Sequence, residues 1–218
     1  MPFTETRAEG LLITRARQYN ALVALMFGGR RGALDRRLAA ATGAAPGERV
    51  VDIGCGPGHL ARRLAARVAP DGDVLGIDPS PGMMRYARRR ARAVPGIRFQ
   101  QGEAQSLDLP AASRDVITST FALHHIAADA REAALREMYR VLRPGGRLLL
   151  ADAFPTGRVT PRVVAAMARM SRHAHDGDAP VDTDVRQYTD VLETAGFKDL
   201  VFTDLPPWTR CVTAVKPR

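Results

Sequence analysis

The chain has 218 residues, of which 45% are hydrophobic and 25% charged, so it is long enough for one α/β domain with a sizeable core and is not a disordered chain. Its net charge of +9 comes almost wholly from arginine, because only Lys198 and Lys216 among the 32 basic residues are lysines; the arginines lie in amphipathic segments, which favours a solvated surface over a nucleic-acid-binding stripe. Two cysteines exclude a disulfide framework, and we expect a soluble, cytoplasmic protein, since the sequence shows no leader peptide and no apolar run long enough to span a bilayer.

Hydrophobic periodicity predicts two helices and then an alternation of strands and helices. Residues 11–43 have apolar residues at helical spacing and are interrupted at Gly28-Gly29, which indicates two helices joined by a turn. The predicted strands that follow are residues 49–53, 73–78, 97–101, 114–120 and 147–152, and the predicted helices are residues 59–69, 79–93 and 128–142. Strands separated by crossover helices of this length pair in parallel.

The pattern changes after Phe154. Residues 163–175 form a Met-rich, helix-like stretch, and residues 184–195 predict a helix that ends at Gly196. Two further β-like segments are residues 197–203 and 208–216. Their short connection favours an antiparallel pair at one edge of the sheet.

We therefore expect an α/β fold with a seven-stranded, mostly parallel sheet, helices on both faces and an antiparallel C-terminal strand pair. Residues 1–45 would form N-terminal helices that act as a lid on the substrate side. Residues 46–218 would form the main domain.

The strongest local signal is the glycine-rich turn within residues 50–60, VVDIGCGPGHL. A predicted strand leads into Gly54, Gly56 and Gly58, and a helix starts directly afterwards. Glycine is needed where the backbone takes unusual dihedral angles or lets a ligand approach closely, and a helix N-terminus offers unpaired N–H groups. Asp78 ends the next strand, 20 residues beyond Gly58, where a carboxylate can accept both hydroxyl protons of a ribose.

Two kinds of cofactor are consistent with a glycine-rich turn of this type. Dinucleotide-binding enzymes use Gly-x-Gly-x-x-Gly with a pyrophosphate over the helix, whereas the spacing here is Gly-x-Gly-x-Gly and Asp52 precedes the turn. A buried carboxylate at Asp52 would repel a pyrophosphate, but it could hold an ammonium group or lie near a sulfonium-bearing amino acid. The spacing therefore favours S-adenosylmethionine over NAD, and a tight turn without a ligand is the remaining alternative.

Five motifs together resemble those of the class I S-adenosylmethionine-dependent methyltransferases. In chain order they are VVDIGCGPG, VLGIDPSPGMM, GEAQSLDLP, DVITSTFALHHI and LREMYRVLRPGGRLLLAD. The chain resembles in particular the ubiquinone/menaquinone biosynthesis methyltransferase group and related small-molecule methyltransferases, over roughly residues 19–216. The resemblance implies a Rossmann-like fold, S-adenosyl-L-methionine as the cofactor, and methyl transfer as the activity.

The resemblance also implies a role for individual residues. The glycine turn with Asp52 matches the motif around the methionine part of the cofactor, and Asp78 matches the acidic residue that holds the ribose hydroxyls. Met83 matches the apolar residue on the adenine face, with core packing as its alternative. Glu103, which is Asp in many relatives, and Ala104 match the pair that reads the adenine edge, although Glu103 could be a solvated turn residue. The expected cofactor-binding set is Asp52, Gly54, Cys55, Gly56, Gly58, Asp78, Pro79, Met83, Gly102, Glu103, Ala104, Thr120 and Phe121.

Histidines are the candidate catalytic residues. Methyl transfer from a sulfonium depends on proximity and alignment, and a general base helps only if the acceptor must lose a proton. His124 and His125 follow the fourth predicted strand, where the chain passes the methyl group in the resembling fold. Loop structure and cofactor packing are the alternative interpretation of this pair.

The segment after the fifth strand, at about residues 155–183, is expected to be an inserted lid over the acceptor. His173 in this segment is a third candidate catalytic residue. His173 and His175, with two aspartates close behind, could bind a metal ion, but ligands on a helix favour i,i+4 spacing over i,i+2. We therefore expect no metal.

The absence of two motifs narrows the range of acceptor molecules that the sequence supports. The Asn/Asp-Pro-Pro-aromatic run of enzymes that methylate base amines is replaced by STFALHH, and no cysteine is placed for attack on a pyrimidine C5. The sequence therefore favours methylation of an oxygen or carbon of a small quinone-like, phenolic or secondary-metabolite acceptor. The alternatives are an RNA or protein methyltransferase that uses the basic surface, and a cofactor-binding protein without methyl transfer.

Overall fold

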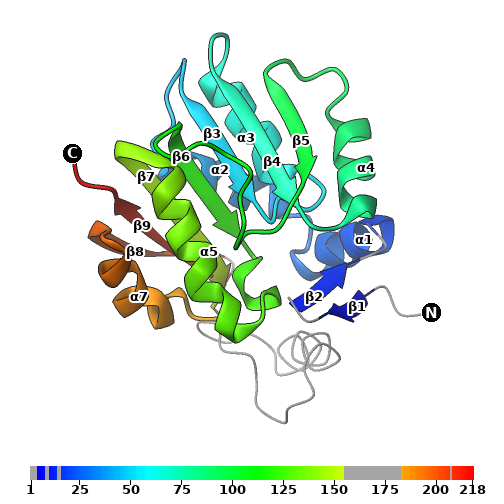
Figure 1. Ribbon diagram of the computed structural model, residues 1–218. Helices are drawn as coiled ribbons and strands as arrows, with labels where there is room; N and C mark the ends of the chain where they lie inside the picture. The colour runs from blue at the N-terminus through cyan, green and yellow to red at the C-terminus, as the bar shows by residue number, and fades with distance from the viewer. Residues whose placement is uncertain (1–3, 8–9, 14–15, 155–182, 207) are drawn as a thin grey trace.

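A seven-stranded sheet with the order β5-β4-β3-β6-β7-β9-β8 forms the centre of the molecule (Figure 1). The computed structural model describes residues 4–7, 10–13, 16–154, 183–206 and 208–218. The strands of the sheet are β3 (Arg49–Ile53), β4 (Asp73–Asp78), β5 (Ile97–Gln101), β6 (Arg114–Thr120), β7 (Leu142–Ala153), β8 (Lys198–Leu205) and β9 (Thr209–Val215).

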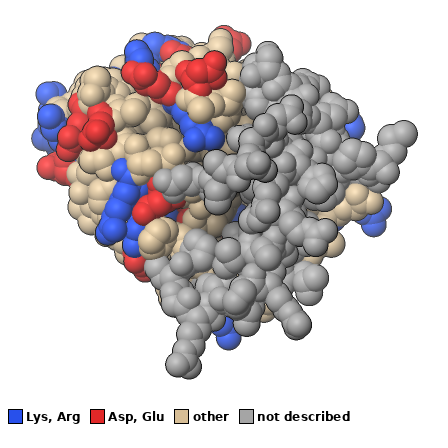
Figure 2. All heavy atoms as spheres, turned by 90° about the horizontal axis from the view of Figure 1, so that it is seen from below, with Lys and Arg blue, Asp and Glu red and all other residues tan. Residues whose placement is uncertain are grey.

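The strand order reverses in the middle of the sheet. The chain runs from β3 outward through β4 to β5 and then returns to β6 on the other side of β3, and these strands and β7 pair in parallel. β9 pairs antiparallel with β7 and with β8, which confirms the predicted fold class. Such a reversal leaves a crevice at the carboxyl ends of the two central strands, where α/β proteins bind ligands. Figure 2 shows this end of the molecule, where acidic and basic side chains are intermixed on the surface that the described residues form.

Helices cover both faces of the sheet because successive side chains of a strand point to opposite faces. In β3, Val50 belongs to one core cluster, with residues of α2, α3 and α4, whereas Val51 belongs to a second cluster, with residues of α5 and α7. The helices are α1 (Ala16–Met26), α2 (Arg31–Ala41), α3 (His59–Val68), α4 (Pro81–Arg90), α5 (Ala128–Val141) and α7 (Thr189–Ala195), with 3-10 turns at Leu123–His125 and Val185–Tyr188. No helix within the described ranges is long and apolar enough to cross a bilayer.

The N-terminal segment contains the two predicted helices, but the first is Ala16–Met26 and does not begin at residue 11, because residues 11–13 belong to a small sheet. α1 and α2 are separated by the predicted turn, where Gly28 and Gly29 have φ of +51° and +75°. Ahead of them β1 (Thr4–Arg7) pairs antiparallel with β2 (Gly10–Ile13). Periodicity did not predict these strands because each has only four residues, too few for an alternating pattern to be recognised.

Other predicted boundaries were wrong as well; the predicted helix over residues 79–93, for example, is the shorter α4, Pro81–Arg90. β7 begins at Leu142 rather than at Arg147, because Leu142 already pairs with Arg114 and the proline and glycines that follow form an irregularity within the strand instead of ending it. The predicted helix over residues 184–195 is a 3-10 turn followed by the shorter α7; it does end at Gly196, whose φ is +104°. The Met-rich stretch at residues 163–175 lies outside the described residues.

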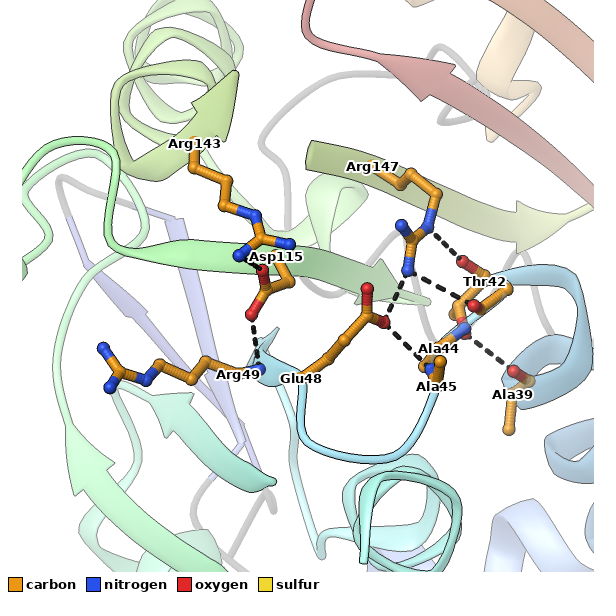
Figure 3. Close-up of polar contacts among 10 residues, drawn as sticks. Ala39, Thr42, Ala44, Ala45, Glu48, Arg49, Asp115, Arg143 and Arg147 are labelled. Carbon is orange, nitrogen blue, oxygen red and sulfur yellow. Dashed lines mark hydrogen bonds and ion pairs between the residues drawn. The ribbon is translucent and has the colours of Figure 1, made fainter. Parts of the chain in front are cut away.

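Glu48 holds the amino end of the sheet together, on the side opposite the crevice (Figure 3). Its Oε2 accepts hydrogen bonds from the backbone N–H of Ala45 at 2.9 Å and from Arg147 of β7 at 2.5 Å. Arg147 also donates to the carbonyl oxygen of Thr42, the C-cap of α2, at 3.1 Å. The connection between α2 and β3 is thereby tied to a strand about a hundred residues away in sequence.

A second carboxylate joins β6 to β3 at the same end (Figure 3). Asp115 accepts a hydrogen bond from the backbone N–H of Arg49 at 2.7 Å and forms an ion pair with Arg143. Its side chain is only 6% exposed, so one hydrogen bond and the neighbouring guanidinium charge offset part of the cost of burying this carboxylate.

We expect Arg147→Met to lower the free energy of unfolding by about 1–3 kcal/mol, because Glu48, whose side chain is 15% exposed, would keep a charge without its charged partner. Denaturant unfolding followed by circular dichroism measures this change. The matched control is Arg136→Met, which removes an exposed i,i+4 pair with Glu132 and should cost about 0.5 kcal/mol or less. Equal losses in the two variants would contradict the role given to Arg147.

Candidate cofactor and acceptor site

A cavity lies in the crevice at the carboxyl ends of β3, β4 and β6 and is bounded on one side by α1. The expected cofactor-binding residues that line it are Asp52, Gly54, Cys55, Gly56, Asp78, Pro79, Met83, Gly102, Glu103, Ala104, Thr120 and Phe121. Of the expected catalytic histidines, His125 lines it as well. Gly58 and His124 do not line the cavity, and His173 lies outside the described residues.

The glycine turn has the left-handed backbone that its sequence predicts. Gly54, Gly56 and Gly58 have φ of +67°, +50° and +73°, which L side chains rarely adopt. A Cβ at Gly54 would lie 2.3 Å from the Cβ of Ala122, in the loop after β6. A Cβ at Gly58 would lie 2.8 Å from the ring of Phe99 in β5. Gly58 therefore allows the start of α3 to pack on the sheet.

Asp78 connects the end of β4 to the glycine turn. Its Oδ2 accepts a hydrogen bond from the backbone N–H of Gly56 at 2.9 Å, and its Oδ1 accepts one from the backbone N–H of Ser80 at 2.9 Å. Burial raises the pKa of this carboxyl to about 6, with a smaller contribution from the charge of Glu103, while the two N–H donors act in the opposite direction. Each carboxylate oxygen can accept a further hydrogen bond. Asp78 can therefore accept hydrogen bonds from two hydroxyl groups.

Asp52 is the most deeply buried charged residue of the cavity, at 1% exposure. Its Oδ1 accepts a hydrogen bond from the hydroxyl of Thr118 at 2.8 Å, but its Oδ2 has no partner among the described residues. The hydroxyl oxygen of Ser119 is likewise buried without a partner in that part of the chain. Burial raises the pKa of Asp52 to about 7. Buried polar atoms normally have partners, so these two mark a place where a ligand can donate hydrogen bonds.

A chain of polar side chains fastens α1 to the cavity wall. Nε2 of His59 lies 2.5 Å from Oδ1 of Asn20, and the Asn20 amide donates to the hydroxyl of Tyr86 at 3.2 Å. Arg62 donates to Nδ1 of His59 at 3.2 Å. Burial lowers the pKa of His59 to about 4, so its ring is neutral at pH 7. A neutral ring that accepts at Nδ1 must donate from Nε2, which fits the Asn20 oxygen as acceptor.

Aromatic rings join α1, the loop after β6 and the start of β9. Phe27 stacks on Trp208 with ring centroids 4.7 Å apart and meets Phe121 edge-on at 5.8 Å. Arg31, held by Asp35 at 2.8 Å, lies over the Phe121 ring at 4.8 Å. Phe121 has a φ of +55°, a strained conformation for a bulky residue. This conformation and its ring contacts place Phe121 in the cavity wall.

His124 and His125 differ in their surroundings. The rings lie 4.0 Å apart between centroids. Nδ1 of His124 lies 2.7 Å from Oδ2 of Asp152, whose other oxygen accepts a hydrogen bond from the backbone N–H of Ala153. Asp152 is 2% exposed, so its contact with His124 is sheltered from water.

Sequence reasoning missed several residues of this site; some belong to α1 and the start of α2, far in sequence from the motifs, and the others lie within the motifs. The missed residues are Tyr19, Asn20, Val23, Arg31, His59, Ser119 and Asp152. Two local signals could have found some of them. Asp152 ends the fifth parallel strand, at the edge of the sheet where ligands bind, and Ser119 lies directly before Thr120 in β6.

Comparison with known proteins connects this geometry to methyltransferases. Residues 50–146 match the family described as "Methyltransferase domain". The demethylmenaquinone methyltransferase of Symbiobacterium thermophilum is 39% identical over 141 residues, which are 63% of this chain and 55% of that protein. The ubiquinone/menaquinone biosynthesis C-methyltransferase UbiE of Ectopseudomonas mendocina is 36% identical over 140 residues, covering 63% of this chain and 54% of the relative. The chain thus spans about half the length of the curated relatives it matches.

A solved structure shares the fold. The SAM-dependent methyltransferase from Aquifex aeolicus superposes with a TM-score of 0.67 at 22% identity, covering 84% of this chain and 89% of that one. The match of residues 50–146, the seven-stranded sheet and these relatives agree with the resemblance of the five sequence motifs. Over residues 50–146 the chain is therefore similar to class I S-adenosylmethionine-dependent methyltransferases, and in particular to those of the ubiquinone/menaquinone biosynthesis group.

Proposed function

We propose that the protein transfers the methyl group of S-adenosylmethionine to an oxygen or carbon of a small organic acceptor. The observation that carries this proposal is the cavity, which brings the buried carboxylates of Asp52 and Asp78 together with an aromatic wall around Phe121. A quinone-like or phenolic acceptor is supported by the curated relatives, which are named for demethylmenaquinone and for ubiquinone/menaquinone biosynthesis.

The polar groups of the cavity suit the two ends of the cofactor. The unpartnered Oδ2 of Asp52 and the hydroxyl of Ser119 fit an ammonium group, which has three protons to donate. Asp78, kept in place by backbone donors, fits the two hydroxyls of a ribose. When bound, the cofactor supplies a methyl group already activated on a sulfonium.

The remaining assignments concern the adenine and rest on position in the cavity. Met83 is 1% exposed and lies at the start of α4, where an apolar face suits one side of a planar ring. Glu103 and Ala104 lie after β5 on the same cavity wall. We assign Glu103 to the exocyclic amine, because a carboxylate accepts hydrogen bonds from such donors.

The acceptor would enter between the glycine turn and α1. Tyr19, Asn20 and Val23 of α1 line the cavity, which supports residues 1–45 as a lid on the substrate side. Such a lid would exclude water from the reacting groups and hold the acceptor in line. The second expected lid, at about residues 155–183, falls almost wholly outside the described residues.

A proton must leave the acceptor when a phenolic or quinol hydroxyl reacts, and the histidines after β6 are suited to take it. We assign His125 as the proton acceptor because it lines the cavity. His124, in contact with the His125 ring and bonded to Asp152, would be a positioning residue. A carboxylate on Nδ1 fixes the tautomer of a histidine and its orientation.

An acceptor screen tests the activity as a whole. The protein is incubated with methyl-labelled S-adenosylmethionine and, separately, with quinols, simple phenols, RNA and peptides. We expect label in a quinol or phenol product. Label in RNA or peptide alone would favour the alternative of a macromolecular acceptor, and cofactor binding without any labelled product would favour a binding protein without methyl transfer.

Asp78→Asn should weaken binding of S-adenosylmethionine by roughly 10- to 100-fold, because hydrogen bonds to a charged partner are worth about 1.5–3 kcal/mol. Isothermal titration calorimetry measures the dissociation constant. Asp108→Asn, an exposed carboxylate remote from the cavity lining, is the matched control and should bind as the unaltered protein does. Unchanged affinity in Asp78→Asn would contradict the ribose assignment.

Cofactor affinity and stability should depend on pH with opposite signs. Binding requires ionised Asp52 and Asp78, so affinity should decrease as the pH falls through about 7 and then about 6. The cofactor-free protein should behave in the other direction: both folded pKa values exceed the unfolded value near 4, so the native state binds more protons between about pH 4 and pH 7. Its free energy of unfolding should therefore decrease as the pH rises through that window.

Calorimetric titrations and denaturant unfolding between about pH 5 and pH 8 measure the two quantities. Asp52→Asn removes the group with the higher pKa and should flatten the stability profile near pH 7. A cofactor-free protein whose stability increases steadily from pH 5 to pH 8 would contradict the assignment of these buried carboxyls.

His125→Gln should lower kcat by roughly 100-fold or more with little change in cofactor affinity, because it removes the proton acceptor. Asp152→Asn should lower kcat less and shift the pH profile, because it acts through the orientation of His124. Single-turnover rates measured against pH separate the two effects. A loss of kcat in His124→Gln that exceeds the loss in His125→Gln would reassign the base to His124.

A further inference from the structure

The face of the sheet covered by α3 and α4 carries an unbalanced positive charge. Residues 53–70 and 79–102 contain no aspartate or glutamate. Exposed arginines on the two helices are Arg63, Arg67, Arg85, Arg88, Arg89 and Arg90. α3 and α4 both pack on the same face, because they contribute to the same core cluster. We refer to these six arginines as the basic face.

Several arginines elsewhere in the described chain form ion pairs with carboxylates. Arg140 pairs with Glu137 on α5, Arg147 with Glu48, and Arg210 with Asp184 and Asp204. In the part of the chain that the structure describes, no arginine of α3 or α4 forms an ion pair. This face therefore carries a group of unpaired positive charges without a nearby carboxylate on α3 or α4, so an anionic partner would meet little repulsion there.

A groove between α1 and α4 extends the basic face towards the cavity. It is lined by Arg17 of α1 and by Arg85, Arg88 and Arg89 of α4, and no carboxylate is among the described residues that line it. Tyr86 lines this groove, and its hydroxyl accepts a hydrogen bond from Asn20, which lines the cofactor cavity. The groove and the cavity are therefore neighbours, separated by the contact between α1 and α4.

We propose that the basic face and this groove bind the surface of a membrane rich in anionic phospholipid, which presents the cavity to an acceptor dissolved in the lipid. The inference rests on the proposed function for its acceptor, since quinone-like molecules with apolar tails partition into bilayers. Guanidinium groups bind phosphate oxygens with two parallel hydrogen bonds. With no described helix able to cross the bilayer, the contact is peripheral and electrostatic.

The distribution of side chains favours a lipid surface over nucleic acid. The arginines are spread over two helices that pack on one face of the sheet, which suits an extended layer of charge. Binding of single strands relies on exposed aromatic side chains on which bases stack. α3 has no aromatic residue, and the one aromatic residue of α4, Tyr86, is half-buried and bonded to Asn20.

Vesicle flotation tests the proposal. The full chain is mixed with vesicles of phosphatidylcholine alone and with vesicles that also contain phosphatidylglycerol, at low and at physiological salt. We expect binding only to the anionic vesicles, and weaker binding at the higher salt. Failure to bind phosphatidylglycerol vesicles at either salt would overturn the proposal.

Replacing arginines of the basic face with glutamate tests whether this face makes the contact with the membrane. Arg85→Glu/Arg89→Glu should weaken vesicle binding by about 25-fold or more, since each basic residue near an anionic surface contributes about fivefold. Neither side chain makes a hydrogen bond to another described residue or lines the cofactor cavity, so the fold and cofactor binding should be kept. The control Arg136→Glu/Lys198→Glu changes the net charge equally at exposed positions on α5 and β8 and should bind the vesicles nearly as the unaltered protein does.

Three outcomes separate the possibilities. Equal losses in both double variants would overturn the assignment to the basic face. Binding to duplex DNA or RNA that is tighter than binding to vesicles and is lost in Arg85→Glu/Arg89→Glu would replace the lipid surface with nucleic acid. Calorimetry with S-adenosylmethionine and turnover of a water-soluble acceptor, both without vesicles, test the proposed function independently, so its failure is distinguishable from failure of the membrane contact.

Discussion

The hydrogen bond from the backbone N–H of Gly56 to the carboxylate of Asp78 joins the two loops around which the site is built. It forms because β3 and β4 pair in parallel with Ile53 opposite Ile77, which brings the ends of both strands to the same level. A shift of this register by one residue would turn Asp78 to the other face of the sheet. The positive φ of Gly56 then directs its N–H towards the carboxylate. Sheet register, glycine conformation and carboxylate position therefore depend on one another.

The same arrangement buries the carboxylates of Asp52 and Asp78 with fewer hydrogen-bond donors than their oxygens can accept. Asp52 and Asp78 are both buried deeply enough to raise their pKa values, and one oxygen of Asp52 has no partner among the described residues. Burial of a charge without full compensation destabilises the folded state. An ammonium group and a ribose diol would supply further donors, so the cost of burying these carboxylates would be offset when a ligand with that chemistry binds. The backbone of Phe121, at the edge of the same cavity, is strained, so this residue also lowers the stability of the fold at the site.

Most of the fold could be predicted from the sequence because the longer strands and helices carry their own periodicity, and many residues that line the cavity could be predicted because they lie in short motifs at strand ends. Contacts between distant elements could not. Asn20 and His59 are 39 residues apart, and His124 and Asp152 are 28 residues apart, with no local pattern that links them. The start of β7 at Leu142 was missed for a related reason: its proline and glycines are typical of a turn, and only the pairing with β6 shows that the strand continues through them.

α1 belongs to two surfaces at once, and this links the cofactor cavity to the basic face. Its inner side presents Asn20 to His59 and to the cavity, while Arg17, one turn earlier, lines the groove beside α4. A neutral His59 is needed for the Asn20 contact, and the neighbouring Arg62 helps to keep the pKa of His59 low. Filling of the cavity and contact of the groove with an anionic surface would both act on the position of this one helix. If each favours the same position of α1, the coupling is reciprocal: a lipid surface that orders α1 raises the affinity of the cavity, and an occupied cavity raises the affinity for the surface by the same factor.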